Sequence, residues 1–270
     1  KNGVIDKLSE MEILNGIILC GDTLHYQISM NSEYADVFQW FIASLIKICK
    51  KNDAFIRIIK GTKSHDLDQL ETIRHYEDDF GIDFKIINDY MIEEIDDMKI
   101  AYIAENYIKD EPKKYYSEIF SKPKEYFDMI FMHGMIEPCQ FFSQQSENID
   151  SSAPIFKLND FFRVCKGPII GGHIHTPMVF TNKFYYVGST LRTCHGEEEP
   201  KGFNIIGMIP DTGDYVVEKV INDNIDDNKP DESVNTDLEK AKYEKLKADY
   251  ELLSPENVND SENYVDSLVQ

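Results

Sequence analysis

Four short, largely apolar runs in this chain each end close to an aspartate or a histidine. They are 17–20 before Asp22, 54–60 before His65 and Asp66, 128–132 before His133, and 168–171 before His173. Apolar runs of this length are typical of strands that are buried on both faces of a parallel sheet. The carboxyl ends of such strands lie along one edge, where sites form in open α/β sheets. The sequence therefore predicts an α/β fold with these side chains at one sheet edge.

The other segments alternate between helical and strand patterns. The spacing of apolar residues predicts helices over 4–14, 33–51 and 67–80, and strands over 84–87 and 99–104. After His175 the sequence pattern changes, because short apolar runs alternate with turn residues. These runs, which favour antiparallel pairing, are 179–180, 184–187, 203–209 and 215–220.

Residues 1–221 are expected to form one domain, and residues 222–270 an acidic linker with a C-terminal helix. The linker is rich in Asp and Asn and contains Pro230. In the helical segment after it, a heptad-like stripe is formed by Tyr243, Leu246, Tyr250 and Leu253. Such a helix would either pack back on its own domain or dock on a partner.

Cysteine usage and hydropathy indicate the cellular compartment of the protein. The chain has five widely spaced cysteines without a CxxC motif, which favours reduced thiols in a cytosolic protein. It contains no run of 18 apolar residues and no secretory signal pattern, so we expect no membrane association. We expect a cytoplasmic protein, and its wealth of Ile, Asn, Lys and Asp suits a bacterial or phage-infected cell.

Six of the seven histidines lie in or beside short motifs that also carry Gly, Asp or Ser. They are His25, His65, His133, His173, His175 and His195. Neutral imidazole and carboxylate are common ligands of Zn, Mn and Fe. Two divalent ions about 3.5–4 Å apart can stabilise the attacking and leaving oxygens of a phosphoryl displacement. The histidines therefore indicate metal-dependent phosphate chemistry, with packing or solvation of each ring as the alternative.

The order of these motifs resembles that of the calcineurin-like metallophosphoesterase superfamily. The shared motifs are Gly21-Asp22, Ser64-His65-Asp66, His133 and Gly172-His173-Ile174-His175. Two further segments, Gly21-Asp22-Thr23-Leu24-His25 and Glu198-Glu199-Pro200-Lys201-Gly202-Phe203, resemble the SbcD-type double-strand-break repair nucleases. The resemblance covers residues 1–221 and implies a four-layer α/β/β/α metallophosphoesterase sandwich, followed here by a C-terminal helical tail.

The resemblance also implies a set of metal ligands. Asp22 would bridge two ions, His133 and His173 would bind the second ion, and His175 would bind the first. The family places an asparagine ligand of the second ion where this chain has Ser64. A serine hydroxyl is a poorer and shorter ligand than a carboxamide, so we expect weaker binding there unless Thr62, Ser64 or a water reaches the ion.

Three residues are expected to act on the substrate by the same resemblance. His65 would contact the scissile phosphate and assist the leaving oxygen, and Asp66 would orient His65. His25 matches the subfamily's histidine that helps to position a DNA strand.

The opening Asp-x-His motif of the family has no counterpart in the printed chain. The helix predicted over 4–14 matches the helix that follows this motif. We therefore expect an apolar strand ending in Asp-x-His upstream of Lys1, which would supply two ligands of the first ion.

The net charge of −21 repels nucleic acid at long range, which lowers the odds of DNA binding without excluding it. Residues 221–270 carry 14 acidic and 5 basic residues, so −9 of this charge lies in the tail. DNA would have to be held locally, and the basic candidates near the motifs are Lys60, Lys63 and Arg192.

The leading expectation is metal-dependent phosphodiester hydrolysis by a DNA exonuclease or endonuclease subunit in repair or recombination. The resemblance implies two divalent ions, usually Mn, with Zn, Fe or Mg as alternatives, and it implies a homodimer partnered by an SMC-like ATPase. One alternative is a phosphatase or nucleotide phosphodiesterase. The other is a catalytically impaired scaffold that binds a partner through its tail.

Overall fold

The computed structural model describes residues 3–29, 31–79, 81–105, 117–139, 154–192, 199–209 and 212–222. Apart from Asn222, the linker and helix predicted over 222–270 lie outside these residues, and so does His195. Among the described residues, no helix is both long enough and apolar enough to cross a bilayer.

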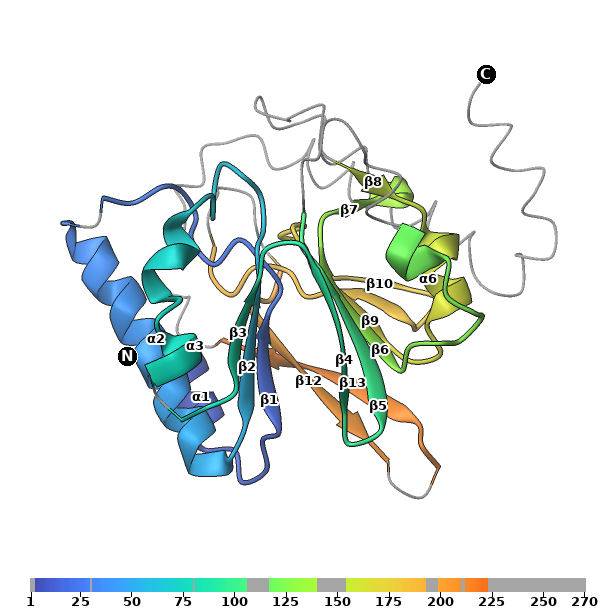
Figure 1. Ribbon diagram of the computed structural model, residues 1–270, viewed down its shortest axis with the longest axis horizontal. Coiled ribbons are helices and arrows are strands. Elements are labelled where there is room, and N and C mark those ends of the chain that lie inside the picture. Colours follow the sequence, from blue (N-terminus) through green and yellow to red (C-terminus); the bar gives the residue numbers. More distant parts are fainter. Residues whose placement is uncertain are drawn as a thin grey trace.

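A three-stranded parallel sheet carries the first two motifs. Its order is β1 (Gly16–Leu19), β2 (Phe55–Ile59), β3 (Phe84–Ile87). One face is covered by helices, as Figure 1 shows, namely α1 (Gly3–Ser9), α2 (Glu33–Asn52) and α3 (Tyr76–Asp79), with a 3-10 turn at Gln69–Ile73. The buried residues of α2 recur with helical spacing, and include Phe38, Ile42, Leu45 and Cys49. This apolar stripe packs on the sheet and fixes the helix against it.

A second sheet of six strands carries the later motifs. Its order is β10 (Met178–Phe180), β11 (Phe184–Tyr186), β9 (Ile169–Gly172), β6 (Met129–His133), β5 (Met98–Ile103), β4 (Tyr90–Ile95). The four inner strands are mutually parallel, and the two edge strands run antiparallel to their neighbours. Helix α6 (Leu158–Val164) packs on this sheet through Phe161 and Val164.

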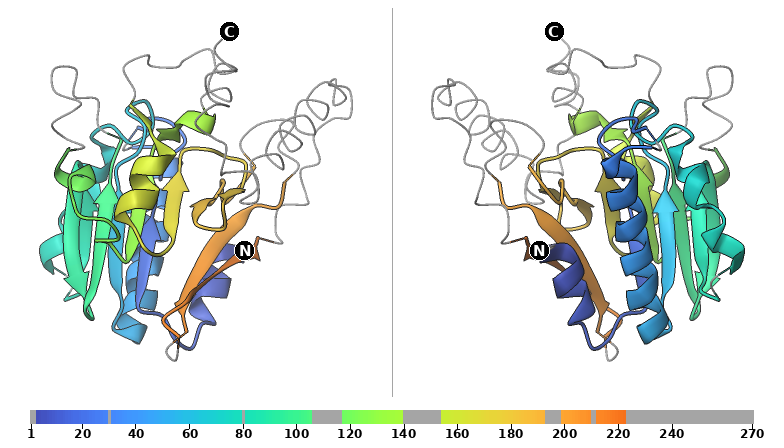
Figure 2. Two further views of the ribbon diagram at one scale, coloured as in Figure 1. Left: turned by 90° about the vertical axis from the view of Figure 1, so that its right-hand side faces the viewer. Right: turned by 90° about the vertical axis from the view of Figure 1, so that its left-hand side faces the viewer.

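Two small strand pairs complete the described structure. Strands β7 (Met135–Ile136) and β8 (Ile155–Phe156) pair in parallel, and a 3-10 turn follows β7 at Glu137–Cys139. Strands β12 (Gly202–Met208) and β13 (Tyr215–Ile221) form an antiparallel hairpin. This hairpin lies beside α1 (Figure 2), where the Lys7 ammonium donates to the Ile221 carbonyl.

The two sheets face each other across a shared apolar cluster. Ile59 and Ile87 of the first sheet pack there with Tyr102, Phe131 and Ile170 of the second. Two further clusters lie on the outer faces, one under α1 and α2 and the other under α6. In Figure 1 the helices accordingly flank a pair of facing sheets. The mixed α/β class predicted from the sequence is confirmed.

Most predicted elements are present, and the differences have local causes. The segment 67–80 is not one helix, because it divides into the 3-10 turn and α3. Strand β4 was missed, because its turn is Asp96-Asp97, with φ values of 49° and 65°, where Asn-Gly is the usual signal for a tight hairpin. The prediction of antiparallel pairing after His175 holds for β10–β11 and β12–β13, but β11 also pairs in parallel with β9.

One buried ion-pair network joins the two sheets. The guanidinium of Arg57, on β2, is fully buried. It donates to both carboxylate oxygens of Glu93 on β4, at 2.8 and 2.9 Å, and to Asp83 at 2.6 Å. Its remaining N–H groups donate to backbone carbonyls, so every donor is satisfied.

We expect Arg57→Met to lower the free energy of unfolding by about 3 kcal/mol, because the largely buried carboxylate of Glu93 loses both Arg57 donors and keeps only Lys85. Asp83→Asn should cost less than about 1 kcal/mol, since that carboxylate is half exposed. Urea unfolding followed by circular dichroism measures both, with exposed Glu94→Gln as the control. Equal stability of Arg57→Met and Glu94→Gln would show that the network contributes little to the stability of the fold.

Candidate metal centre

Three predicted ligands converge at the carboxyl ends of three strands. Asp22 follows β1, His133 ends β6, and His173 follows β9. One ligand atom from each lies within 4.8 Å of the other two, so these residues could hold a divalent ion. The Asp22 Oδ2 and His133 Nε2 atoms are 3.2 Å apart. The site therefore takes residues from both sheets.

The loops that carry these ligands approach one another so closely that glycine is required. A Cβ on Gly172 would lie 1.9 Å from the carbonyl oxygen of Cys20, and a Cβ on Gly61 would lie 2.2 Å from the Asp22 nitrogen. The ligands themselves adopt unusual backbone angles, with φ of 50° at Asp22 and 95° at His173. Backbone strain of this kind persists where the surrounding structure enforces it, and it clusters at functional sites.

Hydrogen bonding fixes the orientation of the His133 ring. Its Nδ1 lies 2.6 Å from the carbonyl oxygen of Cys20. Because a carbonyl can only accept, Nδ1 carries a proton and donates it. The other nitrogen, Nε2, then faces Asp22 and is the one that can bind a metal.

The charges of the cluster are strongly coupled. Burial opposes ionisation of Asp22, but its contacts with His133 and the nearby rings of His65 and His173 hold its pKa below the ordinary value. Burial likewise favours a neutral His133, yet Asp22 and Glu105 raise its pKa to about 9. Burial and the neighbouring His133 lower the pKa of His173. The raised pKa of His133 favours a proton on Nε2, which a metal ion would have to displace.

Two further residues, Thr62 and Glu105, lie in the cluster. Thr62 was an open alternative to Ser64, and Glu105 was not considered. The Thr62 hydroxyl lies 3.1 Å from both Asp22 Oδ2 and Glu105 Oε2, and its backbone N–H donates to Asp22 Oδ1 at 2.6 Å. Glu105 ends a fifth apolar run, 99–104, so the pattern that marked the other ligands also marked this one.

Asp66 is a buried brace between two loops. Its carboxylate accepts backbone N–H groups from Gly61 at 2.8 Å, Asp22 at 3.0 Å and Leu24 at 3.4 Å. Burial and the charge of Asp22 raise its pKa, although these hydrogen bonds oppose the rise. The Nδ1 atom of His65 faces the Leu24 carbonyl at 3.3 Å. These contacts tie the loop after β1 to the loop after β2.

The other predicted residues lie around the cluster. His65 is close enough to Asp22 to influence its ionisation, and the exposed His25 ring meets His65 edge-on, with 5.7 Å between centroids. His175 lies near His173, outside the group of three ligands. Ser64 is exposed, and among the described residues no hydrogen bond joins it to that group. Their proposed roles stay predictions.

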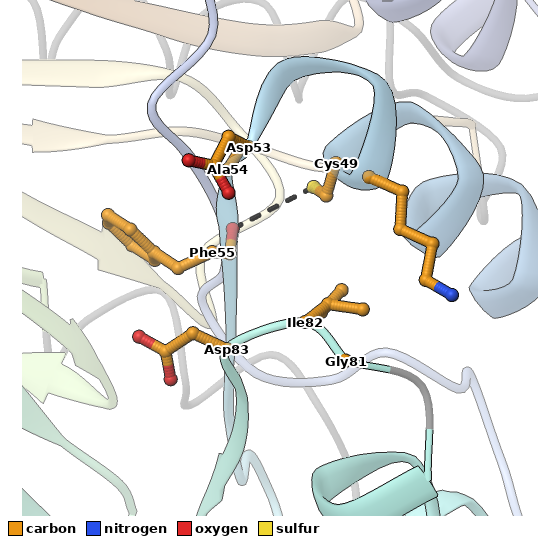
Figure 3. Close-up of a pocket in the computed structure, with 8 residues that line it drawn as sticks. Cys49, Asp53, Ala54, Phe55, Gly81, Ile82 and Asp83 are labelled. Atoms are coloured by element: carbon orange, nitrogen blue, oxygen red, sulfur yellow. Dashed lines mark hydrogen bonds between the residues drawn. The ribbon is translucent and has the colours of Figure 1, made fainter.

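A hollow lies at the other ends of these strands, away from the metal centre (Figure 3). It is lined by residues at the start of β2 and before β3, including Phe55 and Asp83, and by Cys49 of α2. The Cys49 thiol donates to the Phe55 carbonyl at 3.8 Å, and burial raises its pKa to about 12. A thiol in this state is a poor nucleophile and metal ligand.

No protein-family model matches the sequence, and no curated protein matches it. Among solved structures, a chain described as a novel archaeal phosphodiesterase aligns with 80% of this chain and 88% of its own length. The identity is 14% and the TM-score is 0.37. A similarity this low defines neither family nor activity, so function has to be inferred from the residues of the metal centre.

We expect Asp66→Asn to lower the free energy of unfolding by about 1.5–3 kcal/mol, because an amide group cannot accept every N–H that the carboxylate accepts. Loss of the brace should also weaken metal binding by loosening Asp22. Asp68→Asn on the same loop is the matched control, since its side chain is exposed and its change should stay within about 0.5 kcal/mol. Denaturant unfolding and metal titration measure both variants, and indistinguishable results would contradict the brace.

Proposed function

We propose that this chain hydrolyses phosphodiesters at a metal centre. The observation that carries the proposal is the convergence of Asp22, His133 and His173, with the ring of His65 close to Asp22. A bound divalent ion would polarise a phosphoryl oxygen and lower the pKa of a water molecule. A carboxylate with two imidazoles suits Mn, Fe or Zn, and we propose Mn.

The proposal includes the finer features implied by the sequence resemblance. These are a four-layer α/β/β/α sandwich of the SbcD type and two ions, with Asp22 bridging them and His175 on the first. Three apolar clusters support the layers, because one lies between the sheets and one lies on each outer face. The position of Asp22 between the two sheets supports a bridging role.

The geometry suits His65 to act on the substrate. Its Nδ1 faces the Leu24 carbonyl, so a proton on that nitrogen is held and Nε2 is left to meet a phosphate oxygen. An imidazole in this position can stabilise charge on the phosphate and give a proton to the leaving oxygen. His25, edge-on to His65 and exposed, would contact the strand beyond the scissile bond.

A nucleic acid substrate is favoured by exposed aromatic rings beside the centre. Tyr26 is 49% exposed and Tyr34 is 54% exposed, and their rings meet edge-on with 6.4 Å between centroids. Tyr26 also meets the His25 ring at 5.8 Å. Bases stack on rings of this kind whatever their sequence. We therefore propose a DNA nuclease subunit, which acts as a homodimer with an SMC-like ATPase that supplies further basic surface.

We expect His65→Ala to keep its bound metal and to lose about 10²–10⁴-fold in hydrolysis, because it removes a proton donor and not a ligand. Elemental analysis and turnover should be compared in the complete protein. His75→Ala is the matched control, since the His75 ring packs against Tyr76 at the start of α3. A loss of metal in proportion to activity would make His65 a ligand.

A substrate panel tests the proposed function itself. With Mn present, single-stranded and duplex DNA are compared with p-nitrophenyl phosphate and cyclic nucleotides. We expect DNA cleavage with a high KM, because few phosphate contacts act against the net charge of −21. Tyr26→Ala should impair cleavage of single-stranded DNA and spare p-nitrophenyl phosphate. Rapid turnover of small substrates without DNA cleavage, with or without the ATPase, would favour a phosphatase.

A further inference from the structure

We propose that Glu105 is a ligand of the divalent ion held by Asp22, His133 and His173. This inference rests on the metal centre of the proposed function and assigns it a second carboxylate. Glu105 would thus occupy the coordination position for which the sequence offered Ser64 or Thr62.

The burial of Glu105 calls for a cationic partner. Its side chain is 1% exposed, and its Oε1 atom has no hydrogen-bond partner within the described part of the chain. A buried carboxylate oxygen without a partner is costly, and such groups are normally paired or coordinate a metal. The other oxygen, Oε2, accepts the Thr62 hydroxyl and lies 3.6 Å from His133 Nε2 and 3.7 Å from His173 Nδ1.

The spacing of these atoms suits a single ion. Two ligand atoms that are each about 2.0–2.2 Å from one ion lie roughly 3.0–3.6 Å apart. The observed separations are 3.2 Å between Asp22 and His133, and 3.6 and 3.7 Å between Glu105 and the two histidines. The four ligand atoms therefore need to move little to share an ion.

The Thr62 hydroxyl lies beside all four ligands. Its oxygen is 3.1 Å from Asp22 and Glu105 and 3.3 Å from His133 and His173. An ion held between the four ligand atoms would lie next to this hydroxyl. Thr62 would then either turn aside or contribute its hydroxyl as a further ligand.

The backbone holds Glu105 in place independently of any ion. Its N–H donates to the Lys60 carbonyl at 3.3 Å, which joins the end of β5 to the loop after β2. The preceding Ala104 N–H donates to the Asp89 carbonyl at 2.7 Å. A ligand on a rigid strand end is positioned before the metal arrives, which favours binding.

The second carboxylate changes the charge and the metal preference of the centre. Glu105 adds a second negative charge beside Asp22, whereas a hydroxyl or carboxamide would add no charge. Carboxylate-rich sites suit Mn and other oxygen-preferring ions better than sites made of imidazole alone. Glu105 would therefore favour Mn over softer ions at this position.

Metal binding by the complete protein, measured apart from turnover, tests the assignment. Protein freed of metal by a chelator is titrated calorimetrically with Mn²⁺ and with Co²⁺, and the visible spectrum of bound Co²⁺ is recorded. Glu105→Gln keeps the size of the side chain and removes its charge. Glu94→Gln, which alters an exposed carboxylate on β4, is the matched control.

We expect Glu105→Gln to weaken Mn²⁺ binding by more than about 100-fold, beyond the 10–100-fold typical of residues that only support ligands. The Co²⁺ spectrum should change, and Glu94→Gln should bind as the parent does. A smaller loss, or an unchanged spectrum, overturns the ligand role and leaves the metal centre standing. If the parent protein binds neither ion, the proposed centre fails and Glu105 fails with it.

The parent protein gives a second test that needs no folded variant. In crystals soaked with Mn²⁺, anomalous scattering locates the ion, and a Glu105 oxygen should lie about 2.0–2.2 Å from it. A Glu105 carboxylate more than about 3 Å from an ion bound by Asp22, His133 and His173 would refute the assignment. Hydrolysis of phosphodiesters by that same protein would show that the proposed function survives.

Discussion

The centre depends on one buried carboxylate, that of Asp66, which accepts backbone N–H groups from the loops after both β1 and β2. Backbone amides beyond a strand end have no partner in the sheet, and burying them without an acceptor is costly. Asp66 satisfies three of them at once and thereby fixes Asp22 relative to Gly61. The Thr62 N–H then donates to Asp22, so the loop that Asp66 holds also orients the metal-facing carboxylate.

The position of one sheet against the other sets the distances between ligands. Asp22 comes from the first sheet, whereas His133, His173 and Glu105 come from the second. A shift of about 1 Å between the sheets would disrupt a site that has to hold its geometry to about 0.5 Å. The apolar cluster between the sheets resists such a shift, and the buried Arg57 network adds directional contacts that an apolar cluster lacks.

The sequence revealed those parts of the fold and site that depend on local pattern. The run 84–87 was predicted as a strand because it is short and apolar, and β3 has those bounds. Asp22, His133 and His173 could be placed at one edge because each follows such a run, and the structure brings them together. Glu105 follows a similar run, but its role became visible only through contacts with residues that are distant in the sequence. The brace formed by Asp66 was hidden for the same reason, since its partners are backbone groups that no motif specifies.

The charge of the chain constrains how a nucleic acid could be held if the proposed function is right. With a net charge of −21, general electrostatic attraction cannot bring in a polyanion. Attraction would have to come from the bound ions, from the local basic candidates Lys60, Lys63 and Arg192, and from contacts that do not depend on charge. Stacking is such a contact, and Tyr26 presents an exposed ring next to His25, with the exposed ring of Tyr34 beyond it. Bases inside a duplex are already stacked on each other, so these rings would favour single-stranded or unpaired ends. The aromatic surface would then select the form of the substrate, while the metal centre acts on its backbone.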